Sequence, residues 1–245
     1  MLQASSGVQL AVYGVLLFGG VAAIALLAIL LAGAAERVAA RGAAIAAVVG
    51  LAAWFAVAGA TAQIGFLGGG EVPPATVLGL RFALPLAVVA LAFALFEPLR
   101  RLVSDPELQP SLIALQTFRV IGGLFLVLLA LNALPAVFAV PAGLGDVLVG
   151  LTAVAAARSL RAGRTAPAIV WNLLGLLDLV VALTIGVVSA PGPLRLLTVE
   201  PSTAALGALP LVLFPSFLVP FPILLHAISL RSLTAARTVV KAYSS

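Results

Sequence analysis

Long apolar stretches, each separated from the next by a short polar or Pro/Gly-rich break, follow one another along the whole chain. A transmembrane helix needs about 20 consecutive, mainly apolar residues, and seven stretches come near or above that length. The pattern predicts spans over residues 8–34, 43–68, 77–97, 111–133, 145–160, 167–190 and 210–232. We therefore expect an all-α integral membrane bundle of about seven transmembrane helices, forming a single domain over residues 1–245.

Positive charges gather in every second loop between these spans. Ten of the 13 Lys and Arg residues lie in four segments, whereas the intervening segments hold only Arg195. The four segments are residues 35–42, 98–110, 158–166 and 231–245. Because cytoplasmic loops are enriched in Lys and Arg, we expect the N-terminus outside and the C-terminus in the cytoplasm. Residues 1–7 lack the positive charge of a signal peptide, so we expect the first span to be retained.

The composition agrees with a membrane protein and excludes a water-soluble domain. Of the 245 residues, 63% are hydrophobic and 9% are charged, against about 25% charged in average soluble domains. The formal net charge of +5 is therefore interpreted as membrane topology rather than as nucleic-acid binding, and the expected partner is the lipid bilayer. The Ala/Leu/Val/Gly/Arg bias and the absence of Cys favour a bacterial cytoplasmic (inner) membrane.

The polar residues inside the spans are the first candidates for function, since charged groups at the centre of a membrane helix usually face the bundle interior. One set lies at overlapping depths on three spans and comprises Gln116, Arg119, Asn172, Asp178 and His226. This pattern predicts a solute-binding or proton-relay site on the cytoplasmic side of the midplane. The alternative is a neutral Arg–Asp pair that only holds the helices in register.

A second set is expected toward the outer face, where Gln63, Arg81, Asn132 and Asp146 would form a vestibule. Arg81 either pairs with Asp146 there or extends its side chain to the lipid headgroups. Asp146 is also suited to cap the start of a helix at 145. Residues 134–145 are apolar but interrupted by two prolines and two glycines, and we expect irregular backbone there, docked into the bundle.

One short motif resembles that of a known class of enzyme. The sequence GLGD at 143–146 resembles the GxGD element of intramembrane aspartyl proteases, which implies a carboxylate pair that activates water. The second acid here would be Asp178, which follows the motif in the chain. In those proteases the partner acid belongs to a Tyr-Asp dipeptide that precedes the GxGD element. The expected depths of Asp146 and Asp178 also differ. Protease activity is therefore the third of three hypotheses.

Several cofactors are excluded within one chain, and we predict none. The chain has no Cys for Cys-ligated metal and one His, which excludes bis-histidine haem. Its sole Lys, Lys241, follows the last span, which excludes covalent retinal. The first functional hypothesis is a transporter of small solutes, ions or protons; the second is a non-catalytic membrane subunit or receptor-like protein. A homo-oligomer or a larger membrane complex stays open.

The topology can be tested by cysteine labelling. Single cysteines in place of Ser5 and Ser245 should react with a membrane-impermeant maleimide from opposite sides of the membrane, because an odd number of spans separates them. Labelling of both positions from outside intact cells would contradict the seven-span topology.

Overall fold

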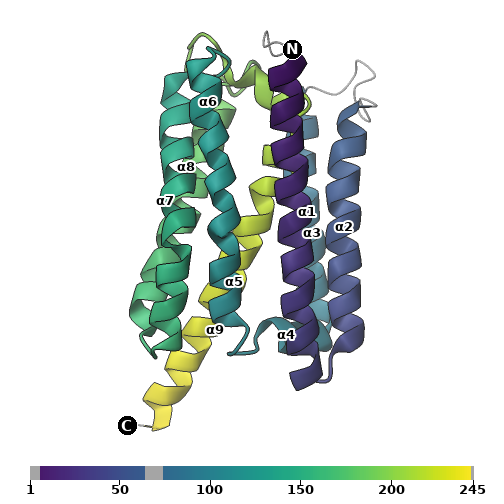
Figure 1. Ribbon diagram of the computed structural model, residues 1–245, viewed down its shortest axis with the longest axis vertical. Coiled ribbons are helices and arrows are strands. Elements are labelled where there is room, and N and C mark those ends of the chain that lie inside the picture. The colour runs from purple at the N-terminus through teal and green to yellow at the C-terminus, as the bar shows by residue number, and fades with distance from the viewer. Residues whose placement is uncertain (1–5, 64–73, 244–245) are drawn as a thin grey trace.

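The computed structural model describes residues 6–63 and 74–243, and these residues form helices without any strand. The helices run up and down along the long axis of the molecule (Figure 1). The α-helices are α1 Ser6–Arg37, α2 Arg41–Gln63, α3 Pro74–Leu95, α4 Glu97–Val103, α5 Gln109–Leu115, α6 Leu124–Ala130, α7 Ala136–Arg161, α8 Thr165–Val188 and α9 Pro220–Tyr243. Three short irregular helices lie between them, at η1 Gln116–Gly123, η2 Thr203–Gly207 and η3 Phe214–Leu218.

The all-α membrane bundle predicted from the sequence is confirmed. Six helices are long and apolar enough to cross a membrane, and a seventh crossing is formed if α3 and α4 count as one bent span. The bend between those two helices is 102°, and it falls at Phe96, whose extended backbone ends α3 just before Glu97-Pro98. α5, η1 and α6 join end to end into one span, Gln109–Ala130.

The main error in the predicted spans concerns α7. Residues 136–145 are not irregular backbone, because a single helix runs from Ala136 to Arg161 and contains Pro141. Proline and glycine are tolerated within membrane helices when neighbouring helices pack against them. Gly143 and Gly145 are such packing positions, since a Cβ at either would overlap Leu126 or Asp178. The fifth span is therefore long and regular, and 145–160 is only its second half.

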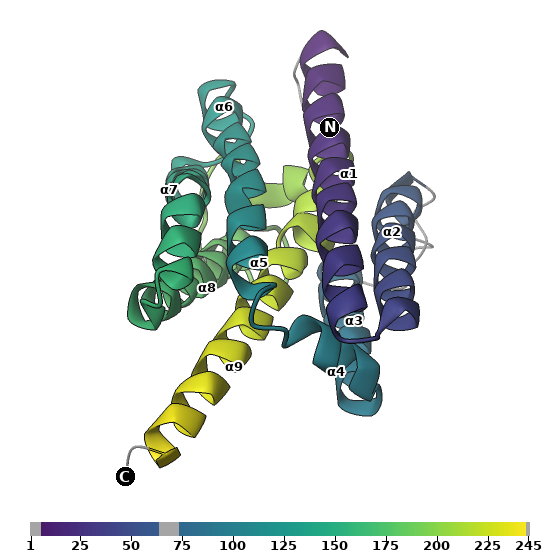
Figure 2. The ribbon, with the colours of Figure 1, turned by 60° about the horizontal axis from the view of Figure 1, so that its bottom comes forward.

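The helices form two groups with α9 between them (Figures 1 and 2). α1, α2 and α3 lie on one side, and α5 to α8 lie on the other. α9 and the π-helical segment η3 contact both groups, because they pack against α2 and α3 as well as α5 and α8. The last span thus contacts both groups, which also meet directly where α1 packs against α5 and η1.

Aromatic packing explains why this central position is stable. Phe217 in η3 is fully buried, and its ring lies edge-on to Trp54 and Phe55 of α2 and stacks on Phe221 of α9. The indole of Trp54 also donates a hydrogen bond of 2.9 Å to the backbone carbonyl of Ser216, which lies inside the π-helical turn. A π-helical turn is a local irregularity that needs such support from neighbouring elements.

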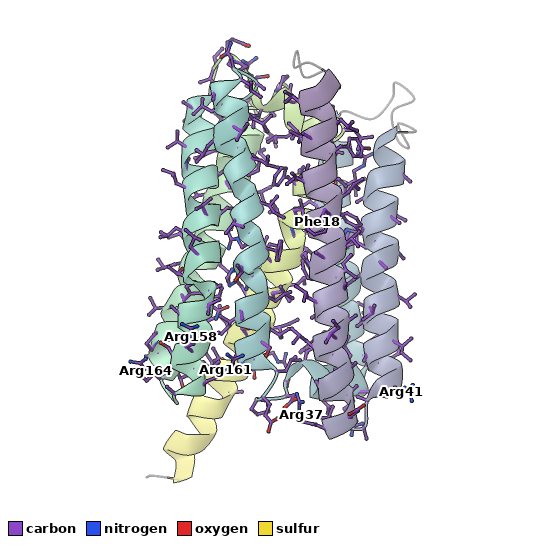
Figure 3. All side chains as sticks on the ribbon, in the orientation of Figure 1. Phe18, Arg37, Arg41, Arg158, Arg161 and Arg164 are labelled. Atoms are coloured by element: carbon purple, nitrogen blue, oxygen red, sulfur yellow. The ribbon has the colours of Figure 1, made fainter. Side chains whose placement is uncertain are left out.

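The outer surface is apolar at mid-height and positively charged at one end. Phe18 is 77% exposed, and Leu148 and Leu151 on α7 are similarly exposed, as suits side chains that face lipid tails. Figure 3 shows the end that carries the charge, which we call the arginine-rich end and which contains Arg37, Arg41, Arg158, Arg161 and Arg164. The C-terminal end of α9 lies at this end and the start of α1 at the other.

Replacing Phe217 should test the role of this packing. Phe217→Ala should lower the free energy of unfolding by about 3–5 kcal/mol, because it leaves a cavity where three aromatic rings meet. Phe18→Ala removes the same side chain from the lipid-facing surface and should change stability little. Thermal unfolding of both variants in detergent provides the measurement, and equal losses would contradict the central position of η3.

Candidate functional site

The side chain of Arg119 lies at the centre of the bundle and contacts three neighbouring spans. Its Nε donates a 2.8 Å hydrogen bond to Oδ1 of Asp146 on α7, and its Nη2 donates to Oδ2 of Asp178 on α8. Nη1 lies 3.3 Å from the carbonyl of Gly175 and 3.1 Å from Nε2 of His226 on α9. Only 1% of the arginine side chain is exposed. A single guanidinium therefore links four of the spans.

His226 extends this network to two amide side chains. Its Nδ1 lies 2.9 Å from Oδ1 of Asn172 and 3.3 Å from Nε2 of Gln116, and all three residues are fully buried. The Asn172 amide also donates to the carbonyl of Ala168 at 2.8 Å. A guanidinium only donates hydrogen bonds, so Nε2 facing Arg119 must accept, and the ring proton belongs on Nδ1, where it donates to Asn172. Gln116 accepts from the same N–H only if its amide is turned so that Oε1 faces the ring. The histidine is therefore neutral in this arrangement.

We call the residues in this network the Arg119 cluster. They are Gln116, Arg119, Asp146, Asn172, Asp178 and His226. Arg119 lies midway along the span Gln109–Ala130, and the two aspartates and the histidine also lie near the middle of their own spans. The indole of Trp171 closes one side, with its ring centre 5.1 Å from that of His226, and donates to Oγ1 of Thr152 at 3.0 Å.

The backbone is shaped around this cluster by glycines and by a change in helix type. Gln116 and Arg119 lie on the 3₁₀-helical segment η1, whose eight residues exceed the three or four that are usual for such helices. Three glycines on three spans supply space for the polar groups, because a Cβ would overlap Asp146 at Gly122, Asp178 at Gly145 and His226 at Gly175. At each of these three positions, a polar side chain of the cluster occupies the space that the Cβ of any other residue would need.

The charges of the cluster balance only if one of its two aspartates is protonated. Arg119 contributes one positive charge, and Asp146 and Asp178 would contribute two negative charges if both were ionised. Each aspartate side chain is 14% exposed. A charge in the interior of a membrane helix costs about 2.5–3.5 kcal/mol on insertion scales, so an unpaired one is expensive. The cluster is therefore more than a neutral ion pair.

The structure brings together all five residues of the first predicted set. Gln116, Arg119, Asn172, Asp178 and His226 come from three spans that the sequence placed at overlapping depths, and they form the continuous network described above. Whether this network binds a solute or relays protons stays a prediction.

Asp146 and Arg81 of the second predicted set do not meet in an outer vestibule. The predicted position of Asp146 at the outer face was wrong. Asp146 does not cap a helix and does not pair with Arg81, because it lies inside α7 and is held by Arg119. Arg81 instead donates to the carbonyl of Thr61 at 2.6 Å. The error follows from treating Pro141 and the adjacent glycines as a break, which moved Asp146 to the outer end. Reading 134–145 as helix from its high apolar content would have placed Asp146 at the depth of Arg119.

Of the other two members of that set, only Asn132 has a described side chain. Asn132 follows α6 with a left-handed backbone (φ 52°), a conformation that asparagine tolerates better than most residues. It lines a cavity of about 370 Å³ together with Pro135, Glu200 and Pro201. Gln63 is the last residue of α2, and its side chain lies outside the described residues.

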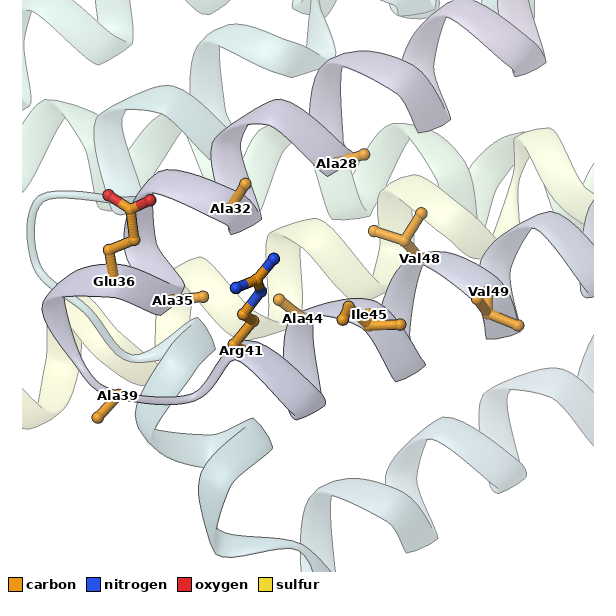
Figure 4. A pocket seen from close by; sticks show the side chains of 10 residues that line it. All are labelled: Ala28, Ala32, Ala35, Glu36, Ala39, Arg41, Ala44, Ile45, Val48 and Val49. Atoms are coloured by element: carbon orange, nitrogen blue, oxygen red, sulfur yellow. The ribbon is translucent and has the colours of Figure 1, made fainter.

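A larger groove lies between α1 and α2 near the arginine-rich end (Figure 4). It has a volume of about 600 Å³ and is open on one side. Alanines from both helices, Ile45, Val48 and Val49 line it, with Glu36 and Arg41 close to the loop that joins the helices. Neither this groove nor the cavity at Asn132 is lined by a residue of the Arg119 cluster.

The geometry differs from that of an aspartyl protease. Contrary to expectation, Asp146 and Asp178 converge at one depth, but the Arg119 guanidinium lies between them and binds both. Aspartyl proteases need two carboxylates that share a proton about one water.

Among residues 6–63 and 74–243, no group of three or more His, Asp or Glu side chains could hold a metal ion.

The fold and the cluster define a multi-pass helical bundle whose apolar helices carry one buried polar network. The chain belongs to the family described as "Domain of unknown function (DUF8737)", whose model matches residues 75–234. The matched region includes every residue of the Arg119 cluster and leaves α1 and α2 outside it. No curated protein matches this chain, and no solved structure matches it.

A double-mutant cycle tests the central ion pair. Arg119→Ala should destabilise the protein more than Arg119→Ala combined with Asp178→Ala, because the single change leaves two carboxylates without their counter-ion. The expected coupling is about 1–3 kcal/mol, measured from unfolding in detergent. Strictly additive effects would show that the two side chains do not interact.

Proposed function

We propose that this protein is a transporter of small solutes or protons in a bacterial cytoplasmic membrane, with the Arg119 cluster as its functional centre. The observation that carries the proposal is the contact of one buried guanidinium with two carboxylates and a histidine from three other spans. Ionisable groups inside a membrane bundle are rare and commonly line ion or substrate pathways.

The irregular backbone beside the cluster supports this proposal. Transporter sites are commonly built where membrane helices are interrupted, and two of the contributing spans are interrupted here. η1 carries Gln116 and Arg119, and the π-helical segment η3 lies directly before α9, which carries His226. A 3₁₀ stretch within a helix often marks a functional hinge, and π-helical turns are frequent at functional sites.

The cluster suggests how such a movement would be controlled. Arg119 holds α7 through Asp146, α8 through Asp178 and α9 through His226, so losing any one contact loosens a different pair of spans. A proton or a charged solute that competes for a carboxylate would release Arg119 from that side. The arginine-rich end faces the cytoplasm in this proposal, as its positive charge favours.

A structural role is the second candidate, and one observation favours it. The Arg119 side chain is almost fully buried, and neither cavity described above reaches it. In that case the network only holds α5–α9 in register, and the apolar outer faces of the bundle bind other membrane proteins. A buried ion pair is by itself weak evidence for more than this.

Flux measurements in proteoliposomes separate the two candidates. Vesicles that contain a pH-sensitive dye would be given a proton gradient and then radiolabelled amino acids, sugars or organic acids in turn. A transporter should move protons, alone or with one of these solutes, and Asp178→Asn should reduce the flux at least tenfold. The matched control is Asp105→Asn, which removes an aspartate from its ion pair with Arg37 at the arginine-rich end.

Two outcomes would contradict transport. One is the absence of both proton flux and uptake of the radiolabelled solutes by the unmodified protein, and the other is an equal flux in Asp178→Asn. If Asp178→Asn lowers only the unfolding temperature, the network is structural.

A further inference from the structure

The charged and titratable groups that face one another in the cluster can be counted element by element. η1 contributes Arg119, α7 contributes Asp146, α8 contributes Asp178 and α9 contributes His226. α5 and α6, which pack against α7, contain no charged residue. Since His226 accepts from the guanidinium and is neutral, two carboxylates face one positive charge.

One oxygen of each carboxylate remains outside the arginine contacts. Arg119 binds Oδ1 of Asp146 and Oδ2 of Asp178. Oδ2 of Asp146 lies beside Gly122, and Oδ1 of Asp178 lies beside Gly145. Each side chain keeps 14% of its surface exposed, so neither carboxyl group is fully enclosed.

A second observation shows that the cluster has unused hydrogen-bonding capacity. Gln116 is fully buried and faces His226, and its Oε1 has no hydrogen-bond partner among the described residues. Turning the amide over would exchange its two ends, but one end would still lack a partner. Ser229, one turn beyond His226 toward the arginine-rich end, is also fully buried, and its Oγ has no partner among the described residues either. Both positions lie on the side of the cluster that faces that end.

We propose that the Arg119 cluster binds one exchangeable proton, held by either Asp146 or Asp178 and delivered from the arginine-rich end. The proton is transferred from a hydronium ion to a free carboxylate oxygen, which forms an O–H bond and leaves water. Its return to water restores the second negative charge. Two carboxylates that face one guanidinium do not both stay ionised at low cost, so one of them takes up a proton on its free oxygen. This inference rests on the proposed function, because it names the ion that such a transporter would use.

A proton fits this site better than a metal cation. Metal cations such as Ca²⁺ and Mg²⁺ need six or more oxygen ligands, and Arg119 already binds two of the four carboxylate oxygens. The described residues offer no metal-binding group of His, Asp and Glu. A proton needs only one free oxygen, and no space has to be opened for it.

Infrared spectroscopy of the purified protein in nanodiscs measures the proton directly. At neutral pH we expect the C=O stretching band of one protonated carboxylic acid, which shifts when H₂O is replaced by D₂O. Asp146→Asn and Asp178→Asn should each remove the band, because one carboxylate is then balanced by Arg119. Asp105→Asn should leave it unchanged, since its ion pair with Arg37 lies outside the cluster.

The same spectra contain the results that would overturn the proposal. It fails if the unmodified protein shows no such band, if the band persists in either aspartate variant, or if sodium in place of choline removes it at constant pH. Arg119→Gln should about double the band, because two carboxylates then lack a counter-ion. Because the band is measured without transport, its presence in a protein without flux would leave the proton site intact and contradict only the proposed function.

Discussion

The contact of Arg119 with two carboxylates is the interaction on which the centre of this bundle depends. A guanidinium cannot lose its charge and offers five N–H donors in a planar arrangement, so it needs several acceptors at fixed angles. Asp146, Asp178 and His226 supply them, and each comes from a different span. The position of one side chain thereby fixes the relative height of four helices, a stronger constraint than apolar packing alone, which permits helices to slide.

Other features of the fold follow from this constraint. Helices that meet through polar groups must approach closely, and the glycines at the contact points on η1, α7 and α8 permit that approach. α9 must reach the same site while it packs between the two groups of helices. The π-helical turn before it, held by Trp54 and packed through Phe217, leads the chain into that position.

Sequence reasoning succeeded for features that depend on composition alone, which are the positions of the spans and the depths of residues within them. The apolar stretches gave the spans, and the depths of Arg119, Asp178 and His226 followed from counting residues from the charged loops. It failed at α7, because a proline inside a membrane helix looks the same in sequence as a proline that ends one. That error separated Asp146 from its partner and assigned it to Arg81. Side-chain contacts such as Arg81 with the carbonyl of Thr61 depend on the rotation of each helix, which a nearly uniform apolar pattern does not define.

The composition of the cluster bears on whether it is only structural. Helix register needs one neutral pair, and replacing a buried pair by apolar residues is often neutral or stabilising. Here a second carboxylate and a histidine contact the same guanidinium, and two amides contact the histidine. Each added polar group raises the cost of placing these spans in a membrane, and the second carboxylate would leave an unpaired negative charge if it were ionised. The exchangeable proton proposed above accounts for the second carboxylate. Arg119 balances one aspartate, and the other aspartate binds and releases the proton.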